Sequence, residues 1–368
     1  MTVLHLMQCT NLGGMEQVAY RLMADLQAAG IEFRLATPMP FGPGADQARR
    51  FDATMRDFPY RGRFGWRDFP AFRRHVRDLA AGCAQIWVTG TSAAALAAIL
   101  GLRQPKVLSH HYHHFEGDHA ALRWRGFYEL LGRQLDAITY PTAFTRDEAL
   151  RIAPWLKGRA HVVPNGFELH YRDEATRLER RAAARRALDL PMDAPVIGNA
   201  GWLIPRKRFD VFLRTAARIH AARPDARFVI CGGGPLEGDL KRMTAALGLE
   251  QAVRFTGWVQ DLTPHYEAWD ALLFNSDFDT LPAAPMEAAS RGCLTVASLL
   301  YGGLGEFIEH GRSGYLFDRH DEPAMAEALL RLTSDSAQAL VLREGAIDKL
   351  RRDFSIERGT AFYRDFFA

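Results

Sequence analysis

Short runs of β-branched and aromatic residues alternate with amphipathic helical stretches along the whole chain, and this alternation is the strongest constraint on its fold. In the stretch Met15 to Ala29, for example, Val18, Leu22 and Leu26 recur every four residues and would cover one face of a helix. Strands that alternate with helices form parallel sheets, because each parallel connection needs a crossover that a helix supplies. We therefore predict an α/β fold. The strands expected in the first half are Val3 to Met7, Phe33 to Ala36, Gln85 to Thr89, Val107 to Ser109, Ala137 to Tyr140 and His161 to Val163.

The second half repeats the pattern after a charged helical stretch, Glu174 to Leu188. A chain of 368 residues suits two domains. We expect two Rossmann-like, doubly wound parallel sheets that face each other across an interdomain cleft, where ligands bind beyond the carboxyl ends of the strands. Residues 1–170 would form one domain, residues 171–352 with a linker at 171–195 the other, and the helix at 353–368 would pack back on the first. The strands expected in the second half are Val196 to Ala200, Phe228 to Cys231, Val253 to Phe255, Ala271 to Phe274, Thr295 to Ala297 and Tyr315 to Phe317.

The composition is that of a globular protein, with 48% hydrophobic and 24% charged residues. The sequence has no run of about 18 uncharged apolar residues, and it enters the first strand without a signal-peptide pattern. We therefore expect a cytoplasmic protein. The four cysteines are far apart and lack metal-ligand spacing, so packed, reduced thiols are expected.

One segment, Arg49 to Arg77, combines nine arginines and three aspartates with seven aromatic residues. Basic residues mixed with aromatics suit an anionic, amphipathic partner such as the inner face of a membrane or a lipid-linked phosphate. A solvated helical surface is an equally weighted interpretation. Nucleic acid is a weaker one, because no nucleic-acid motif accompanies the segment and the rest of the chain is acidic.

Two glycine-rich turns follow predicted strands. Gly13 and Gly14 stand just before the first helix, and Gly233 lies in the run GGGPLEGDL. Glycines at a strand-to-helix turn let a backbone approach a diphosphate, although a tight turn alone also requires them. The first turn is not G-x-G-x-x-G and no acidic ribose ligand follows it, which counts against an NAD enzyme.

The run SHHYHHF places four histidines directly after a predicted strand. Their spacing, without neighbouring carboxylates or cysteines, is poor for zinc, and we expect no metal. A position at the carboxyl end of a strand favours His110 or His111 as a hydrogen-bond partner of a sugar or phosphate. His113 and His114 are expected on the surface of the loop.

Basic and acidic residues follow two strands of the second half. Arg206, Lys207 and Arg208 can neutralise a leaving diphosphate, and cations at a helix start have no obvious structural role. Asp279, expected on an irregular loop, and Glu287, on a helix beginning near Ala284, offer carboxylates to sugar and ribose hydroxyls. The helix start between them adds backbone N–H groups for a phosphate. The residues expected to line the donor there are Leu281, Pro282 and Ala283.

Taken in order, these motifs resemble the retaining family-4 glycosyltransferases of the GT-B fold. The resemblance runs over nearly the whole chain, and the order and spacing of the motifs make it specific. The matching segments are GGMEQVAYRLMADLQAAG, VVPNGF, IPRKRFD, FVICGGGPLEGDL, VRFTGWVQDL, the stretch Asp279 to Glu287, GGLGE and GRSGYLF.

The resemblance implies roles for single residues. Lys207 would contact the donor phosphates, and Glu287 would bind the nucleotide ribose. Val259 would lie beside the base, and Gly13 and Gly14 would face the diphosphate. His110 or His111 would stand near the transferred sugar.

Two residues depart from the family pattern. Asp279 replaces the first glutamate of the family's paired-glutamate signature and is one methylene shorter, so its contact to the donor sugar is in doubt. Trp202 replaces an arginine five residues before Lys207, and we hypothesise that Arg206 or Arg208 compensates.

The activity that the resemblance implies is a retaining, metal-independent hexosyltransferase without a cofactor. It would move a sugar from a nucleoside-diphosphate sugar to a saccharide or lipid-linked saccharide, in polysaccharide, lipopolysaccharide or glycolipid synthesis. The Arg49 to Arg77 segment would hold the acceptor or dock the protein on the inner face of the membrane as a peripheral protein. A nucleotide-sugar epimerase and a catalytically silent sugar-nucleotide binder stay open as alternatives.

Overall fold

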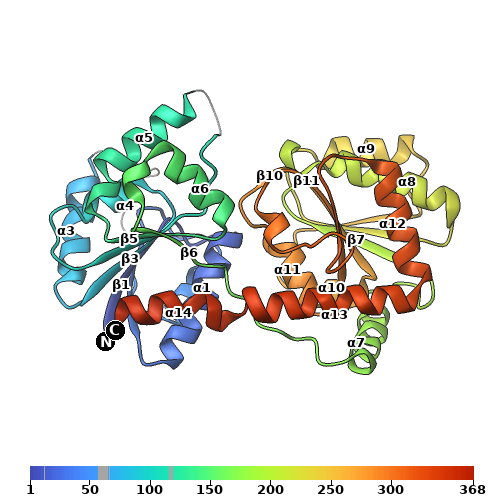
Figure 1. The fold of residues 1–368 in the computed structure, drawn as a ribbon, viewed down its shortest axis with the longest axis horizontal. Coiled ribbons are helices and arrows are strands. Elements are labelled where there is room, and N and C mark those ends of the chain that lie inside the picture. The colour runs from blue at the N-terminus through green and yellow to red at the C-terminus, as the bar shows by residue number, and fades with distance from the viewer. Residues whose placement is uncertain (12, 57–64, 66, 116–118) are drawn as a thin grey trace. The chain divides into compact units, whose positions relative to one another are not determined.

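The computed structural model describes residues 1–11, 13–56, 65, 67–115 and 119–368. The chain divides into two compact units (Figure 1). The first contains Met1–Gly166 and the C-terminal segment Phe354–Ala368, and the second contains Phe167–Asp353. Among the helices of the described residues, none has both the length and the apolarity that crossing a bilayer requires.

The first unit is built on a six-stranded parallel sheet with the strand order β2-β1-β3-β4-β5-β6. Because β1 pairs with β2 on one side and with β3 on the other, the order reverses between β1 and β3, and ligands of such sheets bind at this kind of reversal. The strands are β1 (Thr2–Met7), β2 (Glu32–Ala36), β3 (Gln85–Thr89), β4 (Lys106–Ser109), β5 (Ala137–Tyr140) and β6 (Ala160–Val162).

Helices cover both faces of this sheet, because successive strand residues point to opposite sides. On β3, Ile86 and Val88 pack in one apolar cluster, whereas Trp87 packs in another that includes residues of α1 and α14. Figure 1 shows α14 beside α1. The helices of this unit are α1 (Gly14–Ala28), α2 (Ala45–Arg49), α3 (Phe69–Ala80), α4 (Ala93–Ala98), α5 (Ala120–Leu130), α6 (Ala143–Ile152), α14 (Ile356–Phe367) and the short 3₁₀ helices η1 (Gly132–Gln134) and η2 (Pro154–Leu156).

A phenol from the C-terminal helix reaches the centre of the first sheet. The hydroxyl of Tyr363 lies 2.5 Å from Oγ of Ser109, the last residue of β4, and 2.8 Å from Oγ1 of Thr139 on β5. Its ring packs 4.8 Å from that of Trp87. Helix α14 thus belongs to the first unit although it follows the second one in the chain.

The second unit has its own six-stranded parallel sheet, in the order β12-β11-β10-β7-β8-β9. Here β7 pairs with β8 on one side and with β10 on the other, so the order reverses between β7 and β10. The strands are β7 (Val196–Ala200), β8 (Arg227–Cys231), β9 (Val253–Gly257), β10 (Ala271–Asp279), β11 (Leu294–Gly302) and β12 (Tyr315–Phe317).

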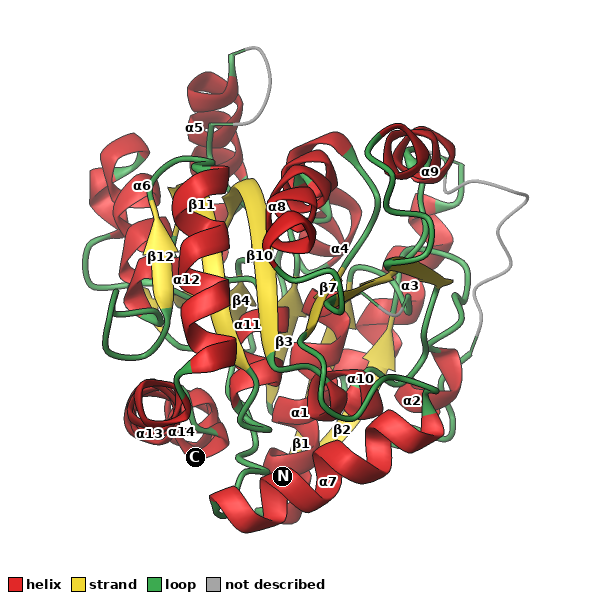
Figure 2. Cartoon of the chain, turned by 90° about the vertical axis from the view of Figure 1, so that its right-hand side faces the viewer, coloured by secondary structure: helices red, strands yellow, loops and turns green. Residues whose placement is uncertain are grey.

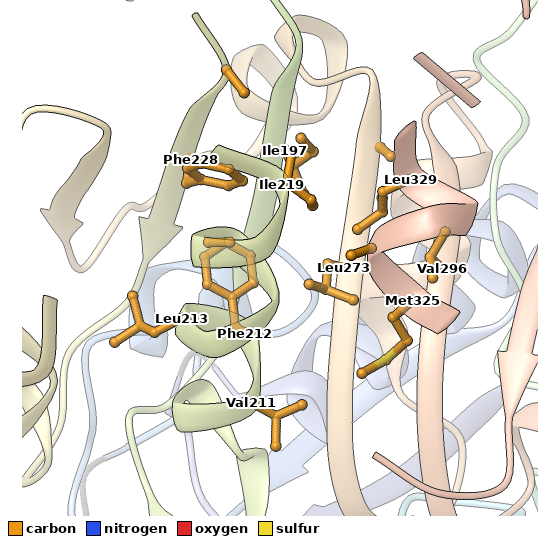
Figure 3. Close-up of a cluster of buried hydrophobic side chains, with 14 of the residues drawn as sticks. Ile197, Val211, Phe212, Leu213, Ile219, Phe228, Leu273, Val296, Met325 and Leu329 are labelled. Atoms are coloured by element: carbon orange, nitrogen blue, oxygen red, sulfur yellow. The ribbon is translucent and has the colours of Figure 1, made fainter. Parts of the chain in front are cut away.

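Helices α8 and α12 lie against one face of the second sheet (Figure 2), and their apolar side chains form its main core. Figure 3 shows Phe212 of α8 and Met325 of α12 among side chains of β7, β8, β10 and β11. The helices of this unit are α7 (Glu174–Ala187), α8 (Phe209–Ala222), α9 (Glu237–Ala246), α10 (Thr263–Ala268), α11 (Ala283–Ala289), α12 (Glu322–Ser334), α13 (Ser336–Asp353) and the 3₁₀ helices η3 (Pro205–Lys207) and η4 (Leu304–Glu306).

Two strands end five residues further along the chain than the sequence pattern indicated. β10 extends to Asp279 and β11 to Gly302, and these two end residues pair with each other in the ladder. The expectation that Asp279 lies on an irregular loop is therefore wrong. The apolar run that marks a strand stops at Phe274, but ladder pairing with β11 continues through the polar residues that follow.

Candidate functional site

The reversal of strand order between β7 and β10 brings together basic and acidic residues that are about 70 positions apart in the sequence. After β7 the chain turns through η3, which contributes Arg206 and Lys207. β10 ends at Asp279. Both strands are parallel, so their carboxyl ends meet at the same edge of the sheet.

Asp279 joins the two cations. Nζ of Lys207 donates a hydrogen bond to one carboxylate oxygen at 2.6 Å, and Nη1 of Arg206 donates to the other at 3.1 Å. Ser276 donates a third hydrogen bond from Oγ at 2.9 Å. All these groups lie at the edge where ligands of doubly wound sheets bind.

The same contacts shift the ionisation of both partners. Burial alone would raise the pKa of Asp279, but Lys207 and Arg206 together hold this pKa below its usual value. Burial lowers the pKa of Lys207, and the Asp279 charge opposes this effect. The lowered pKa of Asp279 means that its carboxylate is charged at neutral pH.

Arg208 does not join this cluster, although the sequence grouped it with its neighbours. Its guanidinium donates two hydrogen bonds to Asp210 and one to Asp277, at 3.0 to 3.1 Å. Its backbone is left-handed, with φ 48° and ψ 46°, where the chain passes from η3 into α8. Of the two arginines proposed to compensate for Trp202, only Arg206 shares a partner with Lys207.

Trp202 is one of two exposed indoles at this edge. Its side chain is 57% exposed and its ring meets that of Trp258 edge-on, with centroids 6.3 Å apart. Val259, the residue expected beside the base, follows Trp258 and is half-buried. Trp258 was not singled out from the sequence, where an aromatic residue after a strand gives no signal of its own.

The glycine-rich turn after β8 lies between these loops. A Cβ on Gly232 would come within 1.9 Å of the carbonyl oxygen of Gly201, so this position requires glycine for packing. A Cβ on Gly233 would meet nothing within 4 Å. Packing therefore explains the glycine at 232 but not the one at 233, for which the expected donor contact stays a prediction.

Glu287 lies on α11, and its carboxylate accepts a hydrogen bond from the hydroxyl of Tyr266 at 3.3 Å. The segment before this helix runs from β10 into the helix start, with Leu281 and Pro282 buried and Ala283 half-buried. The sequence placed this helix start correctly within one residue.

In the first unit, Gly13 and Gly14 stand at the start of α1, the helix that follows β1. A Cβ on Gly13 would lie 2.6 Å from a carboxylate oxygen of Glu16, whereas a Cβ on Gly14 would meet nothing within 4 Å. The Glu16 carboxylate is buried in the first turn of α1 and accepts a hydrogen bond from the Cys9 thiol. A Cβ at position 13 would displace only the end of the Glu16 side chain, so packing alone does not require glycine there, and the expected diphosphate contact of Gly13 and Gly14 stays a prediction.

His110 and His111 diverge after β4. The His110 ring is fully buried and stacks on His114 with centroids 4.7 Å apart, near the ring of Tyr140. Burial and the neighbouring histidines lower the pKa of His110 well below its usual value. His110 therefore points into the aromatic interior of the first unit.

His111 instead lines a small cavity, together with Ser109, Thr139 and Tyr363. Burial lowers the pKa of His111 to about 4, so its imidazole is neutral near pH 7. Of the two candidates, His111 is the one that lines this cavity.

The expectation that His113 and His114 lie on the loop surface is wrong. Both side chains are buried, and the ring Nδ1 of His113 lies 3.4 Å from a carboxylate oxygen of Glu148 on α6. Nε2 of His114 lies 2.6 Å from the hydroxyl of Tyr128. Glu148 follows 34 residues after His114, so the loop sequence gave no indication of it. Within the described ranges, no group of three or more His, Cys, Asp or Glu side chains is arranged to hold a metal.

The basic and aromatic segment Arg49 to Arg77 falls partly on residues 57–64 and 66, which lie outside the described residues. Of its described aromatics, Phe72 is fully buried in the core and Phe51 stacks on Tyr20. These two rings therefore pack against other residues of the first unit. The membrane partner proposed for the segment stays a prediction.

Comparison with known families gives two matches, one in each half of the chain. Residues 12–171 match the model described as Glycosyltransferase Family 4, and residues 194–335 match the model described as Glycosyl transferases group 1. The second match contains Lys207, Asp279 and Glu287.

Curated relatives match over part of their length. A D-inositol 3-phosphate glycosyltransferase of Thermobispora bispora is 36% identical over 179 residues, which are 45% of this chain and 41% of the relative. The lipopolysaccharide core biosynthesis glycosyltransferase LpsE of Rhizobium meliloti is 29% identical over 182 residues, which are 50% of this chain and 52% of the relative. The chain thus spans about half the length of these relatives.

Solved structures match over the whole chain. HepE of Anabaena, crystallised with UDP and glucose, superposes with a TM-score of 0.83 at 18% identity and covers 99% of this chain and 98% of its own. The lipopolysaccharide outer core galactosyltransferase WaaB superposes with a TM-score of 0.70 at 15% identity, over 100% of this chain and 99% of its own. These likenesses confirm the predicted fold, and the two family matches identify the chain as a member of the group 1, family 4 glycosyltransferases with the GT-B fold.

Proposed function

We propose that this protein is a retaining glycosyltransferase that moves a hexose from a nucleoside-diphosphate sugar to a saccharide or lipid-linked saccharide. The observation that carries the proposal is the pairing of Lys207 and Arg206 on Asp279 where the strand order of the second sheet reverses. Two cations held close together in a partly buried position suit the diphosphate of a sugar nucleotide.

The proposed reaction requires stabilisation of the negative charge that develops on the leaving diphosphate. In the proposed reaction, the bond between the anomeric carbon and the donor diphosphate breaks and the acceptor hydroxyl oxygen bonds to that carbon on the same face. The acceptor proton passes to the leaving phosphate oxygen, so no protein nucleophile is required. Negative charge grows on the diphosphate as it leaves, and Lys207 and Arg206 would stabilise it in the way that fixed cations stabilise a transition state.

Arg206 takes the role of the missing family arginine in this proposal. Trp202 stands in that position, and Arg206 reaches the same carboxylate as Lys207 from the adjacent residue. Arg208 is occupied by Asp210 and Asp277. Replacing Arg206 by Ala should therefore weaken binding of a nucleoside diphosphate about tenfold, the loss of roughly one charge-assisted hydrogen bond.

The substrate class rests on the relatives. They include an enzyme named for D-inositol 3-phosphate and enzymes named for lipopolysaccharide core synthesis, and HepE was crystallised with UDP-glucose. We therefore propose a uridine diphosphate sugar as donor and an acceptor of cell-envelope polysaccharide or glycolipid synthesis.

A thermal-shift screen against UDP, GDP, ADP and their sugar conjugates tests the donor. A nucleotide that binds only the folded protein raises the melting temperature by mass action. The donor found in this way is then incubated with and without a panel of saccharide acceptors, and the products are separated by chromatography.

Each product pattern decides between functions. Sugar transferred with the anomeric configuration of the donor supports the proposal. An isomerised donor without acceptor supports an epimerase, and binding with neither hydrolysis nor transfer supports a silent binder. No stabilisation by any nucleotide would refute the proposal.

A further inference from the structure

We infer that Arg208, Asp277 and His320 form a chain of hydrogen bonds that positions the turn carrying Arg206 and Lys207. The inference rests on the proposed function, because it assigns a role to residues beside the proposed diphosphate site. None of the three touches the cluster around Asp279 with its own side chain. They are positioning residues, which act through Lys207 and Arg206.

The backbone at Arg208 is the first observation. With φ 48° and ψ 46° it is left-handed, a conformation that few residues other than glycine, asparagine and aspartate adopt. Arg208 directly follows Lys207, so this turn sets the direction in which the Lys207 side chain leaves the backbone. An unfavourable backbone conformation persists only where the surroundings hold it.

Hydrogen bonds from the guanidinium of Arg208 stabilise this backbone conformation. Nε and Nη2 each donate to one carboxylate oxygen of Asp210 at 3.0 Å, in a two-pronged arrangement. Nη1 donates to Oδ1 of Asp277 at 3.1 Å. The planar fork of an arginine suits this geometry, and the flexible ammonium of a lysine does not.

Asp277 is held in turn from the other side. Nε2 of His320 lies 2.9 Å from Oδ1 of Asp277, and Nδ1 of His320 lies 2.6 Å from Oγ of Ser298. Asn275 donates from Nδ2 to the same Ser298 oxygen at 2.9 Å. The imidazole tautomer with its proton on Nε2 satisfies the whole chain, since Ser298 then accepts from Asn275 and donates to Nδ1 of His320.

Two acidic residues of β10 therefore bind the three consecutive basic residues at the end of η3 and directly after it. Asp279 binds Arg206 and Lys207, and Asp277 binds Arg208. The turn is tied to the strand end at two points, which restricts both the position and the tilt of the two cations. Cations held in place before the ligand arrives need no rearrangement when charge develops on the diphosphate.

One end of this hydrogen-bond chain lies close to the surface and the other is buried. The side chains of Arg208 and Asp277 are 29% and 34% exposed, whereas that of His320 is 10% exposed and Ser298 is fully buried. Ion pairs at the exposed end contribute modestly to overall stability. The effect of Arg208 on the position of Lys207 can thus be separated from its effect on folding.

Three substitutions test the inference. Arg208→Gly removes the guanidinium, while glycine adopts the left-handed conformation without cost, so the fold is retained. His320→Leu removes the hydrogen bond to Asp277, and His320→Gln keeps an N–H donor for it. Arg214→Ala is the matched control, because Arg214 also binds Asp210 but makes no contact with Asp277.

We expect turnover of the donor sugar to fall about tenfold in Arg208→Gly and His320→Leu, with a smaller change in the KM for the donor. A shift in the position of a binding group by a fraction of an ångström is enough for such a loss. His320→Gln should recover most of the turnover and Arg214→Ala should match the parent protein. Unchanged turnover in both Arg208→Gly and His320→Leu, or an equal loss in Arg214→Ala, would overturn the inference.

A crystal structure of ligand-free Arg208→Gly decides the point independently of catalysis. We expect the Lys207 Nζ to move out of hydrogen-bond distance of Asp279. A contact kept at its present 2.6 Å would overturn the positioning role, whatever nucleotide the protein binds. Failure of the parent protein to bind UDP, GDP or ADP would count against the proposed function alone.

Discussion

Nζ of Lys207 lies 2.6 Å from Oδ2 of Asp279, and the two residues are brought together from different strands of the second sheet. The family resemblance of the sequence motifs predicted a glutamate at position 279, where this chain has an aspartate. The shorter aspartate reaches both the lysine and Arg206. A donor diphosphate bound by these cations would share them with the Asp279 carboxylate.

Replacing Lys207 by Met should weaken binding of the preferred nucleoside diphosphate by about tenfold to a hundredfold, since a hydrogen bond to a charged group contributes about 1.5 to 3 kcal/mol. Isothermal titration calorimetry measures the change. Lys241→Met is the matched control, because Lys241 forms an exposed pair with Glu237 on α9. An equal loss in the control would show that net charge, and not this site, controls binding.

Replacing Asp279 by Asn should destabilise the protein by about 2 kcal/mol, because two partly buried cations lose their counter-ion. The pKa of Asp279 is held below its usual value, so the pair contributes stability above about pH 4 that is lost as pH falls through the lowered pKa. Urea unfolding from pH 7 down to pH 3 measures both effects. Asp279→Glu, which keeps the charge, should stay within about 0.5 kcal/mol of the parent protein; a loss as large as that of Asn would contradict this account.

His5 should make the protein less stable in weak acid. Burial lowers its pKa to about 3, and its ring stacks on Trp87 with centroids 4.0 Å apart. The unfolded chain takes up a proton near pH 6.5 and the folded protein does not, so stability is present above about pH 6.5 and is lost as pH falls toward 3.

The difference in unfolding free energy between pH 7.5 and pH 5 isolates this residue. It should be smaller by about 2 kcal/mol in His5→Gln than in the parent protein, given about 1.4 kcal/mol per pH unit for one proton. Comparing differences removes the effect of the substitution on packing. Equal differences in both proteins would mean that His5 titrates normally in the fold.

Phe212 should be among the most costly core positions of the second unit. It is fully buried and meets Phe228 edge-on with centroids 6.3 Å apart (Figure 3). Phe212→Ala should lower the free energy of unfolding by about 3 to 5 kcal/mol through lost burial and the cavity left behind. Leu178→Ala on the exposed face of α7 should change it by less than about 0.5 kcal/mol. Denaturant unfolding compares the two, and a similar cost for both would contradict the core assignment.

Removing the Tyr363 hydroxyl should loosen α14 without displacing its aromatic ring. Tyr363→Phe leaves Ser109 and Thr139 without their shared partner, at a cost of about 1 to 2 kcal/mol. Hydrogen exchange of the α14 amides should become faster than that of α8, which serves as the internal reference. Unchanged protection of α14 would show that its apolar contacts alone hold it to the sheet.

The site was predictable where neighbouring residues in the sequence act together. The helix start before Glu287 follows from local signals, because a proline and the onset of an apolar pattern mark it within a few residues. The extension of β10 to Asp279 could not be predicted, since it depends on pairing with β11. The burial of His113 and His114 likewise depends on Glu148 and Tyr128, which come from other helices.

The sequence by itself determined the class of fold, because the alternation of apolar strands with amphipathic helices admits a parallel sheet and little else. It also singled out Lys207, Asp279 and Glu287 as candidate site residues through the order of their motifs. Only the tertiary structure decided which cations share a carboxylate. Arg206 and Arg208 are equivalent in the sequence, but they bind different carboxylates. The left-handed turn at Arg208 directs its side chain to Asp277, whereas Arg206 reaches Asp279. Such choices depend on where two strand ends meet in space, and no local pattern of residues encodes that meeting point.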